Sequence, residues 1–489
     1  NYMGIPKMAI INIKIFRSEA AQGAIANSFG MLIGIVNAMW LMPLLFSIEE
    51  IGFYRWVERT GMFLAQIGLF GLHRVYIKFH SLLIPEERRG LLNQILLIFI
   101  TVTVTLTTLL KCFELAIASF FKLQEYYSFM WVLGIMSMGT MAHFLGSSIS
   151  STTGAVRRPF IWRSVLLRIL LFSTGILVYL QLINFFTWVQ LQVLFTLMLG
   201  GGIMIWSLKL VGWRLALPWR YNGQKKREMF DFGLFNTFNS FLSFAIGVID
   251  VQLIIYFLGV GSLGIFSLAS FVAFFVDGIK RPLSQKAIPR FAELWNKGER
   301  SQIHAYYKRT ALWITMVAVL SFIVVIPQLD MLFAFIPGGD RFFEAKPLIV
   351  YMLFARIVDY AFGYNGEVLA NGPYYKESLI FSACMLIVLI CTGVILIPRL
   401  GLLGAALSFL IVNSIFNVFK ATYLFKKEGW HPFSTAQLKV ILSGFSVFGA
   451  SMYFSGNSIL DVGFRIILCG VWLFWIMRIV FPTSRLEKK

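Results

Sequence analysis

The chain has 489 residues, of which 58% are hydrophobic, 16% aromatic and 13% charged. Soluble domains carry about 25% charged residues, so this composition excludes an ordinary soluble protein. Continuous apolar runs of about 20 residues also exclude an outer-membrane barrel, whose strands alternate polar and apolar positions. The formal net charge of +20 is therefore not read as a sign of nucleic-acid binding. We predict an all-α protein with many membrane spans.

Windows of about 20 mostly apolar residues predict fourteen membrane helices. Their approximate bounds are 22–46, 52–72, 91–110, 129–149, 161–181, 187–207, 233–257, 263–281, 310–330, 346–369, 377–397, 401–424, 437–455 and 461–482. With these spans, 34 of the 43 Lys and Arg residues fall on one side of the membrane and 8 on the other. Cytoplasmic loops carry the excess of Lys and Arg, so both termini are predicted to be cytoplasmic.

An internal repeat divides the predicted helices into two sets. A shift of 212 residues aligns 24–90 with 236–302 without gaps, and 12 of the 67 pairs are identical. Because each copy contains six helices, an even number, both copies enter the membrane in the same orientation, as in transporters built from parallel repeats. The domains expected from this repeat are a cytoplasmic segment (1–21), an N-lobe (22–207), a basic linker (208–232), a C-lobe (233–424), and helices 13 and 14 with a cytoplasmic tail (425–489).

Motif searches find no catalytic signature. The sequence has no HExxH, no GxxxxGK[ST] and no DxD. A GxGxxG match at Gly259, Gly261 and Gly264 falls in a predicted turn between two membrane helices, without the strand that a dinucleotide site requires. The four cysteines form no CxxC, so neither a disulfide framework nor a zinc site is indicated. No enzyme activity, cofactor, metal or nucleic-acid partner is predicted.

Ionisable residues inside predicted spans are functional candidates, because each costs about 2.5–3.5 kcal/mol or more at the bilayer centre. Arg356 and Asp359 share one face of the tenth span at i,i+3 spacing, either as a neutralised structural pair or as part of a site. Asp250 in the seventh span has no cation at i±3 or i±4, which makes it the candidate for an ion-coupling or proton site. Asp277 precedes Lys280 and Arg281 by one turn and is expected to pair within its own helix.

Three further arginines lie in or near predicted spans. Arg55 and Arg59 share a face at the outer end of the second span, either as an interfacial cluster or as the mouth of a cationic cavity. Arg168 lies two turns into the fifth span, where its side chain can also reach back to water. With Arg356, these arginines suit an anionic cargo, since guanidinium binds phosphate oxygens in bidentate fashion.

Several loose motifs of glycine and aromatic residues give the chain a family resemblance. They are Ser28-Phe29, Ile51-Gly52-Phe53-Tyr54, Gly68-Leu69-Phe70-Gly71-Leu72, Leu263-Gly264-Ile265-Phe266-Ser267-Leu268-Ala269, a basic loop with Pro289 and Phe291, and Gly401-Leu402-Leu403-Gly404-Ala405-Ala406. Over about residues 20–425 the chain resembles the lipid-linked oligosaccharide (polysaccharide) flippases of the multidrug/oligosaccharidyl-lipid/polysaccharide (MOP) exporter superfamily. Helices 13 and 14 match the fourteen-helix members.

The resemblance implies a bacterial inner-membrane protein that moves an undecaprenyl-diphosphate-linked oligosaccharide, such as an O-antigen or capsule repeat unit, to the periplasmic leaflet. It implies two lobes that open alternately around a cationic cavity. Arg55, Arg59, Arg168, Arg356 and Asp359 are the cargo candidates because of their depth in the predicted spans and their charge, since none of the arginines falls in a motif of the family. Membrane lipids and the polysaccharide polymerase machinery are the implied partners. The alternative is an ion-coupled multidrug exporter of the same superfamily, which should depend on unpaired acids rather than on arginines.

Overall fold

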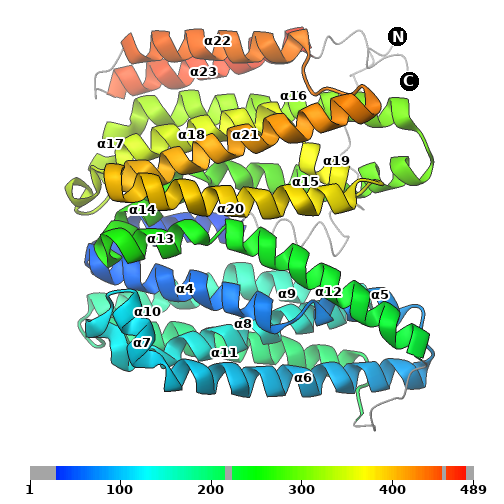
Figure 1. Cartoon of the computed structure of the whole chain (residues 1–489). Coiled ribbons are helices and arrows are strands. Elements are labelled where there is room, and N and C mark those ends of the chain that lie inside the picture. Colours follow the sequence, from blue (N-terminus) through cyan, green and yellow to red (C-terminus); the bar gives the residue numbers. More distant parts are fainter. Residues whose placement is uncertain (1–28, 215–222, 454–458, 481–489) are drawn as a thin grey trace, which may run out of the picture. The chain divides into compact units, whose positions relative to one another are not determined.

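The computed structural model describes residues 29–214, 223–453 and 459–480, and within these ranges it contains helices and no strands (Figure 1). The chain forms two compact units. Unit 1 takes the described residues up to Leu45 and Trp56–Phe244, and unit 2 takes Phe46–Arg55 and the described residues from Ala245 onward. All-α architecture is confirmed, as expected where backbone groups must be satisfied inside each segment in lipid. The predicted lobe boundaries stay a prediction.

Unit 1 contains the first group of helices, and the last two residues of the last one already belong to unit 2. Their bounds are η1 (Asn37–Leu41), α3 (Met42–Leu45), α4 (Ile48–Gly68, shared with unit 2), α5 (Leu72–His80), α6 (Pro85–Cys112), α7 (Glu114–Phe120), η2 (Gln124–Phe129), α8 (Trp131–Ser151), α9 (Arg157–Ile161), η3 (Trp162–Leu166), α10 (Leu167–Tyr179), α11 (Phe185–Leu210) and α12 (Gly223–Ile246).

Unit 2 contains the second group of helices. They are α13 (Ile249–Leu258), α14 (Val260–Ala273), α15 (Phe275–Asn296), α16 (Arg300–Val325), η4 (Ile326–Gln328), α17 (Leu329–Phe335), η5 (Gly339–Phe342), α18 (Ala345–Ala361), α19 (Asn365–Ala370), α20 (Tyr375–Leu400), α21 (Leu402–Glu428), α22 (Thr435–Tyr453) and α23 (Ile459–Val480).

Each of the fourteen predicted spans overlaps helix in the structure. Eight helices of the described part are long and apolar enough to cross a membrane, or ten if the bent pairs α12–α13 and α14–α15 each count as one span. The four others are the helix over Phe29–Leu45, α4, α18 and α22. Of these, α4 and α18 carry several charged residues. A multi-span protein is therefore confirmed, while the total of fourteen stays a prediction.

Glycines set the close contact between α8 and α11 in unit 1. A Cβ on Gly200 of α11 would lie 2.0 Å from the carbonyl oxygen of Gly139 on α8. A Cβ on Gly146 would lie 2.7 Å from the backbone nitrogen of Met204. Small residues let membrane helices approach backbone to backbone, where dispersion replaces the hydrophobic effect as the packing force.

A second glycine contact in unit 2 joins the two copies of the sequence repeat. A Cβ on Gly52 would lie 2.0 Å from the carbonyl oxygen of Val260, and a Cβ on Gly264 would lie 2.1 Å from that of Ile48. Ile48 and Val260 are equivalent under the 212-residue shift, as are Gly52 and Gly264. The contact is therefore self-complementary, as a two-fold relation between equivalent segments requires. It also explains why Phe46–Arg55 belongs to unit 2.

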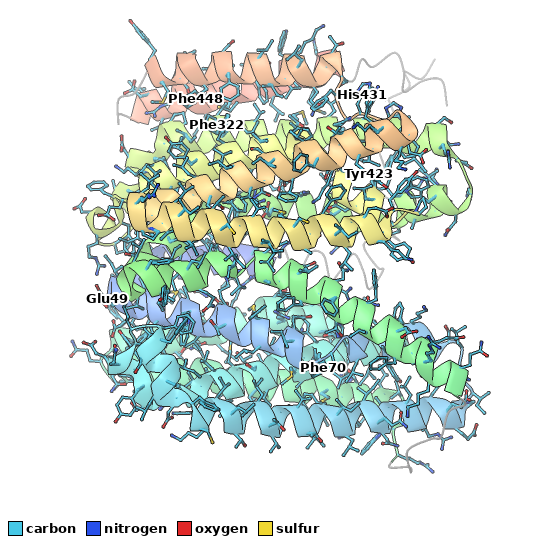
Figure 2. All side chains as sticks on the ribbon, viewed as in Figure 1. Glu49, Phe70, Phe322, Tyr423, His431 and Phe448 are labelled. Carbon is cyan, nitrogen blue, oxygen red and sulfur yellow. The ribbon has the colours of Figure 1, made fainter. Side chains whose placement is uncertain are left out.

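Helices α22 and α23 pack beside each other and against α16 (Figure 1). The ring of Phe322 on α16 lies 5.1 Å from that of Phe448 on α22 (Figure 2). The indole of Trp472 on α23 donates a hydrogen bond to the Ser443 hydroxyl at 3.0 Å. These two helices therefore pack onto unit 2, and their place outside the duplicated segment stays a prediction.

Candidate functional site

The charged network of unit 2

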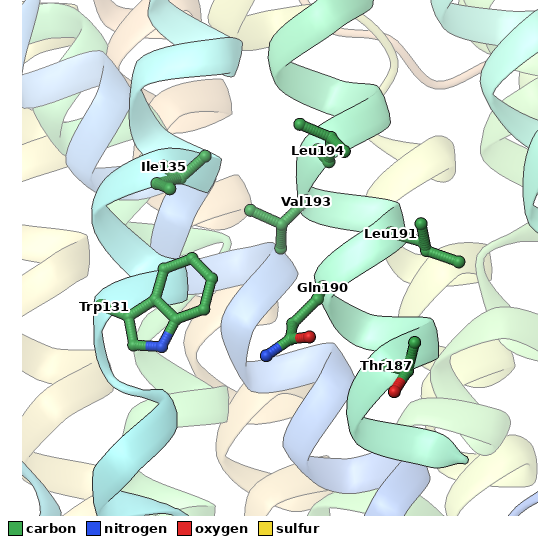
Figure 3. A pocket seen from close by; sticks show the side chains of 7 residues that line it. All are labelled: Trp131, Ile135, Thr187, Gln190, Leu191, Val193 and Leu194. Carbon is green, nitrogen blue, oxygen red and sulfur yellow. The ribbon is translucent and has the colours of Figure 1, made fainter. Parts of the chain in front are cut away.

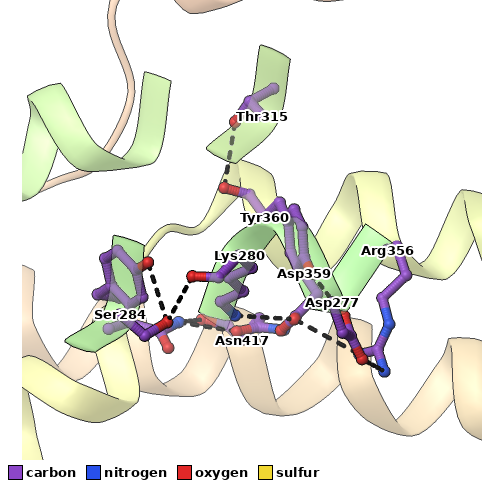
Figure 4. Close-up of polar contacts among 10 residues, drawn as sticks. Asp277, Lys280, Ser284, Thr315, Arg356, Asp359, Tyr360 and Asn417 are labelled. Atoms are coloured by element: carbon purple, nitrogen blue, oxygen red, sulfur yellow. Dashed lines mark hydrogen bonds and ion pairs between the residues drawn. The ribbon is translucent and has the colours of Figure 1, made fainter. Parts of the chain in front are cut away.

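Three helices of unit 2 bring four charged side chains together. Asp277 and Lys280 come from α15, Arg356 and Asp359 from α18, and the amide of Asn417 on α21 completes the network (Figure 4). Asp277 and Lys280 lie on the part of α15 that forms an apolar span together with α14, and α21 is itself long and apolar enough to span a membrane. Two of the three helices of the network are therefore parts of apolar spans, and α18 packs against α14 and α21.

The strongest contact in the network is a hydrogen-bonded ion pair between α15 and α18. An Nη atom of Arg356 lies 2.8 Å from a carboxylate oxygen of Asp277. The other oxygen of Asp277 accepts a hydrogen bond of 2.5 Å from the Tyr360 hydroxyl. The sequence predicts that Asp277 pairs with Lys280 or Arg281 of its own helix, and that prediction is wrong about the partner. The neighbouring helix supplies an arginine and a tyrosine in better geometry, and charge-assisted bonds of this kind are the strong ones.

Asp359 is shared between two cations and an amide. Its carboxylate lies 3.7 Å from Arg356 and 3.7 Å from Lys280. It accepts a hydrogen bond of 3.0 Å from Asn417, whose own oxygen accepts one of 2.9 Å from Asn365. The predicted i,i+3 contact between Arg356 and Asp359 is confirmed, although it is the longer of the two ion pairs that Arg356 makes.

Aromatic rings enclose both cations of the network. The guanidinium of Arg356 lies 4.4 Å from the centre of the Phe274 ring and 5.2 Å from that of Phe409. The ammonium of Lys280 lies 4.5 Å from the centre of the Tyr360 ring. Such contacts stabilise a cation where water is scarce. The Nε of Arg356 is buried and donates to no described residue, so the guanidinium keeps a free donor.

The four charged side chains remain partly accessible. Their exposed fractions are 15% for Arg356, 19% for Lys280, 21% for Asp359 and 31% for Asp277, whereas the Tyr360 residue is fully buried. The two acids balance the two bases, so the group is neutral when all four are ionised. A ligand anion that takes the place of an acid beside these cations must therefore displace its carboxylate, which makes ligand binding and the positions of the acids interdependent.

Where the other predicted residues lie

Arg168 packs within unit 1 against the glycine face of the first described helix. A Cβ on Gly30 would lie 1.9 Å from the carbonyl oxygen of Ser164, and one on Gly34 would lie 3.0 Å from the Nε of Arg168. The backbone oxygen of Arg168 accepts a hydrogen bond of 2.9 Å from Asn37. Asn37 and Ser164 each belong to a short π-helical segment, Asn37–Leu41 and Trp162–Leu166. Arg168 is half-buried among these helices.

The remaining predicted residues occupy three other places. Arg55 is half-buried in unit 2, with its guanidinium 5.7 Å from the centre of the Phe271 ring. Arg59 belongs to unit 1 and is exposed. Asp250 lies in the first turn of α13, where its carboxylate accepts a bond of 2.8 Å from the Val251 amide. A bend of 44° between α12 and α13 places Asp250 at the start of a helix, where an acid is favoured by the helix dipole.

Sequence reasoning misses two members of the network. The charge count places Lys280 among the cytoplasmic charges, and no pattern in the apolar windows singles out Asn417. A signal is present on α21, where Asn413, Asn417 and Lys420 follow at i+4 and i+3 spacing and so form a polar stripe on an otherwise apolar helix. No group of three or more His, Cys, Asp or Glu side chains suited to a metal ion occurs within the described ranges.

Comparison with known proteins

Searches with the sequence find no matching family model and no matching curated protein. The structure, by contrast, matches several solved transporters. A lipid II flippase, MurJ, in an inward closed conformation aligns with a TM-score of 0.76 at 14% identity, covering 94% of this chain and 98% of MurJ.

Two multidrug transporters of the MATE family also match. An inward-facing MATE transporter of the MOP superfamily aligns with a TM-score of 0.61 at 14% identity, covering 86% of this chain and 97% of that one. The MATE multidrug transporter DinF-BH, in a ligand complex, aligns with a TM-score of 0.55 at 17% identity, covering 87% and 98%. This chain therefore has the polytopic helical fold of MurJ and the MATE transporters, and these structural neighbours are transporters.

Proposed function

We propose that the chain is a flippase that moves an undecaprenyl-diphosphate-linked oligosaccharide from the cytoplasmic to the periplasmic leaflet of a bacterial inner membrane by alternating access. The observation that carries the proposal is the network in unit 2, in which Lys280 lies on the apolar α14–α15 pair and Arg356 on the neighbouring α18, together with acids that an anionic group can replace. The match to MurJ over 94% of the chain supports a lipid-linked cargo. Both termini are proposed to be cytoplasmic, and membrane lipids and the polysaccharide polymerase machinery are the proposed partners.

A diphosphate can compete with the two carboxylates for the same cations. Arg356 presents a planar fork of donors and keeps its Nε unpartnered among the described residues, and Lys280 lies on the other side of Asp359. When phosphate oxygens replace Asp277 at Arg356, the released carboxylate loses its cation and needs another partner. Cargo binding and the position of Asp277 are then linked. A difference in cargo affinity between two states is what allows binding to shift a conformational equilibrium.

Transport of a fluorescent lipid-linked oligosaccharide in reconstituted vesicles tests this proposal. Compared at equal amounts of folded, reconstituted protein, Arg356→Met should abolish transport, and Arg356→Lys should keep part of it because charge persists without the planar fork. Arg281→Met is the matched control, since Arg281 is an exposed arginine on α15 next to the network. Full transport by Arg356→Met would reject the network as the cargo site. Arg55, Arg59 and Arg168 remain proposed cargo ligands and can be replaced in the same assay.

A multidrug exporter is the second candidate function. The observation in its favour is the exposure of Asp277 and Asp359, because a partly exposed carboxylate in a span can also bind an organic cation. The structural neighbours include MATE multidrug transporters. Deletion of the gene separates the two functions. Accumulation of lipid-linked repeat units on the cytoplasmic leaflet supports the flippase, whereas an unchanged lipid pool with loss of drug resistance supports the exporter.

A further inference from the structure

Unit 1 has a cavity of about 330 Å³ between α8 and α11, and none of the residues proposed above as cargo ligands lines it (Figure 3). One stripe of each helix lines it. Trp131 and Ile135 come from α8 at i,i+4 spacing, and the residues from α11 are Thr187, Gln190, Leu191, Val193 and Leu194. Its volume is at the lower end of the range of small-ligand sites, about 300–1,000 Å³.

The cavity opens onto the lipid-facing side of α11. This helix is long and apolar enough to cross a membrane. Leu194, which lines the cavity, is 39% exposed, and the next apolar residues along the same stripe, Met198 and Ile205, are 58% and 55% exposed. A row of exposed large apolar side chains on a spanning helix faces hydrocarbon rather than water. The cavity is therefore continuous with the surface that the acyl chains cover.

The lining residues are ordered from polar to apolar along the helices. Trp131 is the first residue of α8 and Thr187 lies in the first turn of α11, so both helices begin at the same end of the cavity. Helix ends with Trp are typical of the membrane interface. Ile135, Val193 and Leu194 lie further along the helices, toward the hydrocarbon. The polar end of the cavity thus lies at the interface and the apolar end lies deeper.

Two hydrogen-bond donors face this polar end without a protein partner. The Trp131 indole and the Gln190 amide come from opposite walls (Figure 3). Neither side chain makes a hydrogen bond to another described residue. A glutamine amide left unpaired at a lipid-facing position is costly, so an acceptor from outside the protein is expected. A polyprenyl tail has no acceptor, whereas the ester carbonyls of a phospholipid lie at the depth of the interface and are good acceptors.

We propose that this cavity, the α8–α11 groove, binds one acyl chain of a membrane phospholipid. The ester carbonyl accepts hydrogen bonds from Trp131 and Gln190, and the first part of the chain packs against Ile135, Val193 and Leu194. The groove is thus a phospholipid site of unit 1, separate from the charged network and independent of the proposed cargo.

Photo-crosslinking of the full chain tests the groove. The protein is reconstituted in vesicles of phosphatidylethanolamine and phosphatidylglycerol that contain a phosphatidylethanolamine with a diazirine in one acyl chain, and labelled peptides are mapped. We expect label concentrated on the segments 131–135 and 187–194. Gln190→Leu should lower that label about fivefold, the factor for one lost hydrogen bond. A diazirine-bearing polyprenol without ester groups should label the groove weakly and should not respond to Gln190→Leu.

Two further variants separate specific binding from general lipid contact. Leu194→Trp fills the groove and should remove the label, whereas Met198→Trp on the same face outside the groove should leave it unchanged. Circular dichroism checks that each variant is folded. If Leu194→Trp does not fold, the loss of label in Gln190→Leu is the test of the groove. Equal labelling along the whole exposed face of α11, or stronger labelling by the polyprenol, would overturn the proposal.

Discussion

Arg356→Met should destabilise the protein more than Asp277→Asn, although both remove one side of the same ion pair. Without Arg356, Asp277 loses the cation that lies 2.8 Å from it, while Asp359 keeps Lys280 at 3.7 Å. Without the Asp277 charge, Arg356 keeps Asp359, and the asparagine oxygen can still accept the bond from Tyr360. Arg356 therefore forms ion pairs with two acids, and its removal leaves Asp277 without its cation.

The magnitudes follow from the geometry. Two unit charges 2.8 Å apart attract by about 6 kcal/mol at an effective dielectric constant of about 20, before desolvation is subtracted. Breaking a buried pair by removing one partner costs about 3–5 kcal/mol. Because Asp277 is 31% exposed, we expect about 3 kcal/mol for Arg356→Met and about 1–2 kcal/mol for Asp277→Asn. The double variant should lose about 1–3 kcal/mol less unfolding free energy than the two single variants lose together.

The assay is equilibrium unfolding of the purified protein in one detergent, with the wild type, both single variants and the double variant measured side by side. Arg281→Met controls for the loss of an arginine and should stay within about 0.5 kcal/mol of the wild type, because its side chain is exposed. The assigned pairing would be refuted if the stability losses of the two single variants add strictly to that of the double variant. A larger loss for Asp277→Asn than for Arg356→Met would refute it as well.

Three other predictions concern packing, pH and topology. Gly264→Ala places a Cβ 2.1 Å from the carbonyl oxygen of Ile48, so it should cost about 1–3 kcal/mol in the same unfolding assay, and an unchanged stability would contradict the close contact. Hydrogen bonds from two neighbouring cations lower the pKa of the exposed Glu293 carboxyl from 4.5 to about 2. Because the folded-state pKa of Glu293 is lowered, its ionised carboxylate stabilises the fold above pH 4.5, and this stabilisation is lost as the pH falls toward 2. The small difference in Tm between wild type and Glu293→Gln should therefore be constant from pH 7 to about 5.5 and shrink at lower pH. Reporter fusions should place Lys489 in the cytoplasm and Gly339 in the periplasm, and a periplasmic Lys489 would remove the fourteen-span topology.

Helix content was predictable because it depends on local properties. Each predicted span overlaps helix, since an apolar run of sufficient length satisfies its backbone internally. The repeat was also visible in the sequence, and the contact of Gly52 with its repeat-equivalent region at Gly264 shows why glycine recurs there. Hydropathy alone was less informative for α4 and α18, because their charged residues lower the mean hydropathy of each window.

Charge partners were predictable only within one helix. The Arg356–Asp359 contact follows from i,i+3 spacing, and the structure confirms it. Asp277 pairs with Arg356 across 79 residues of sequence, and its nearer sequence neighbour Lys280 turns instead toward Asp359. Helical periodicity fixes which side chains share a face, but the rotation and separation of packed helices decide which faces meet. Those depend on side-chain packing and on close backbone contacts, and only the tertiary structure shows them.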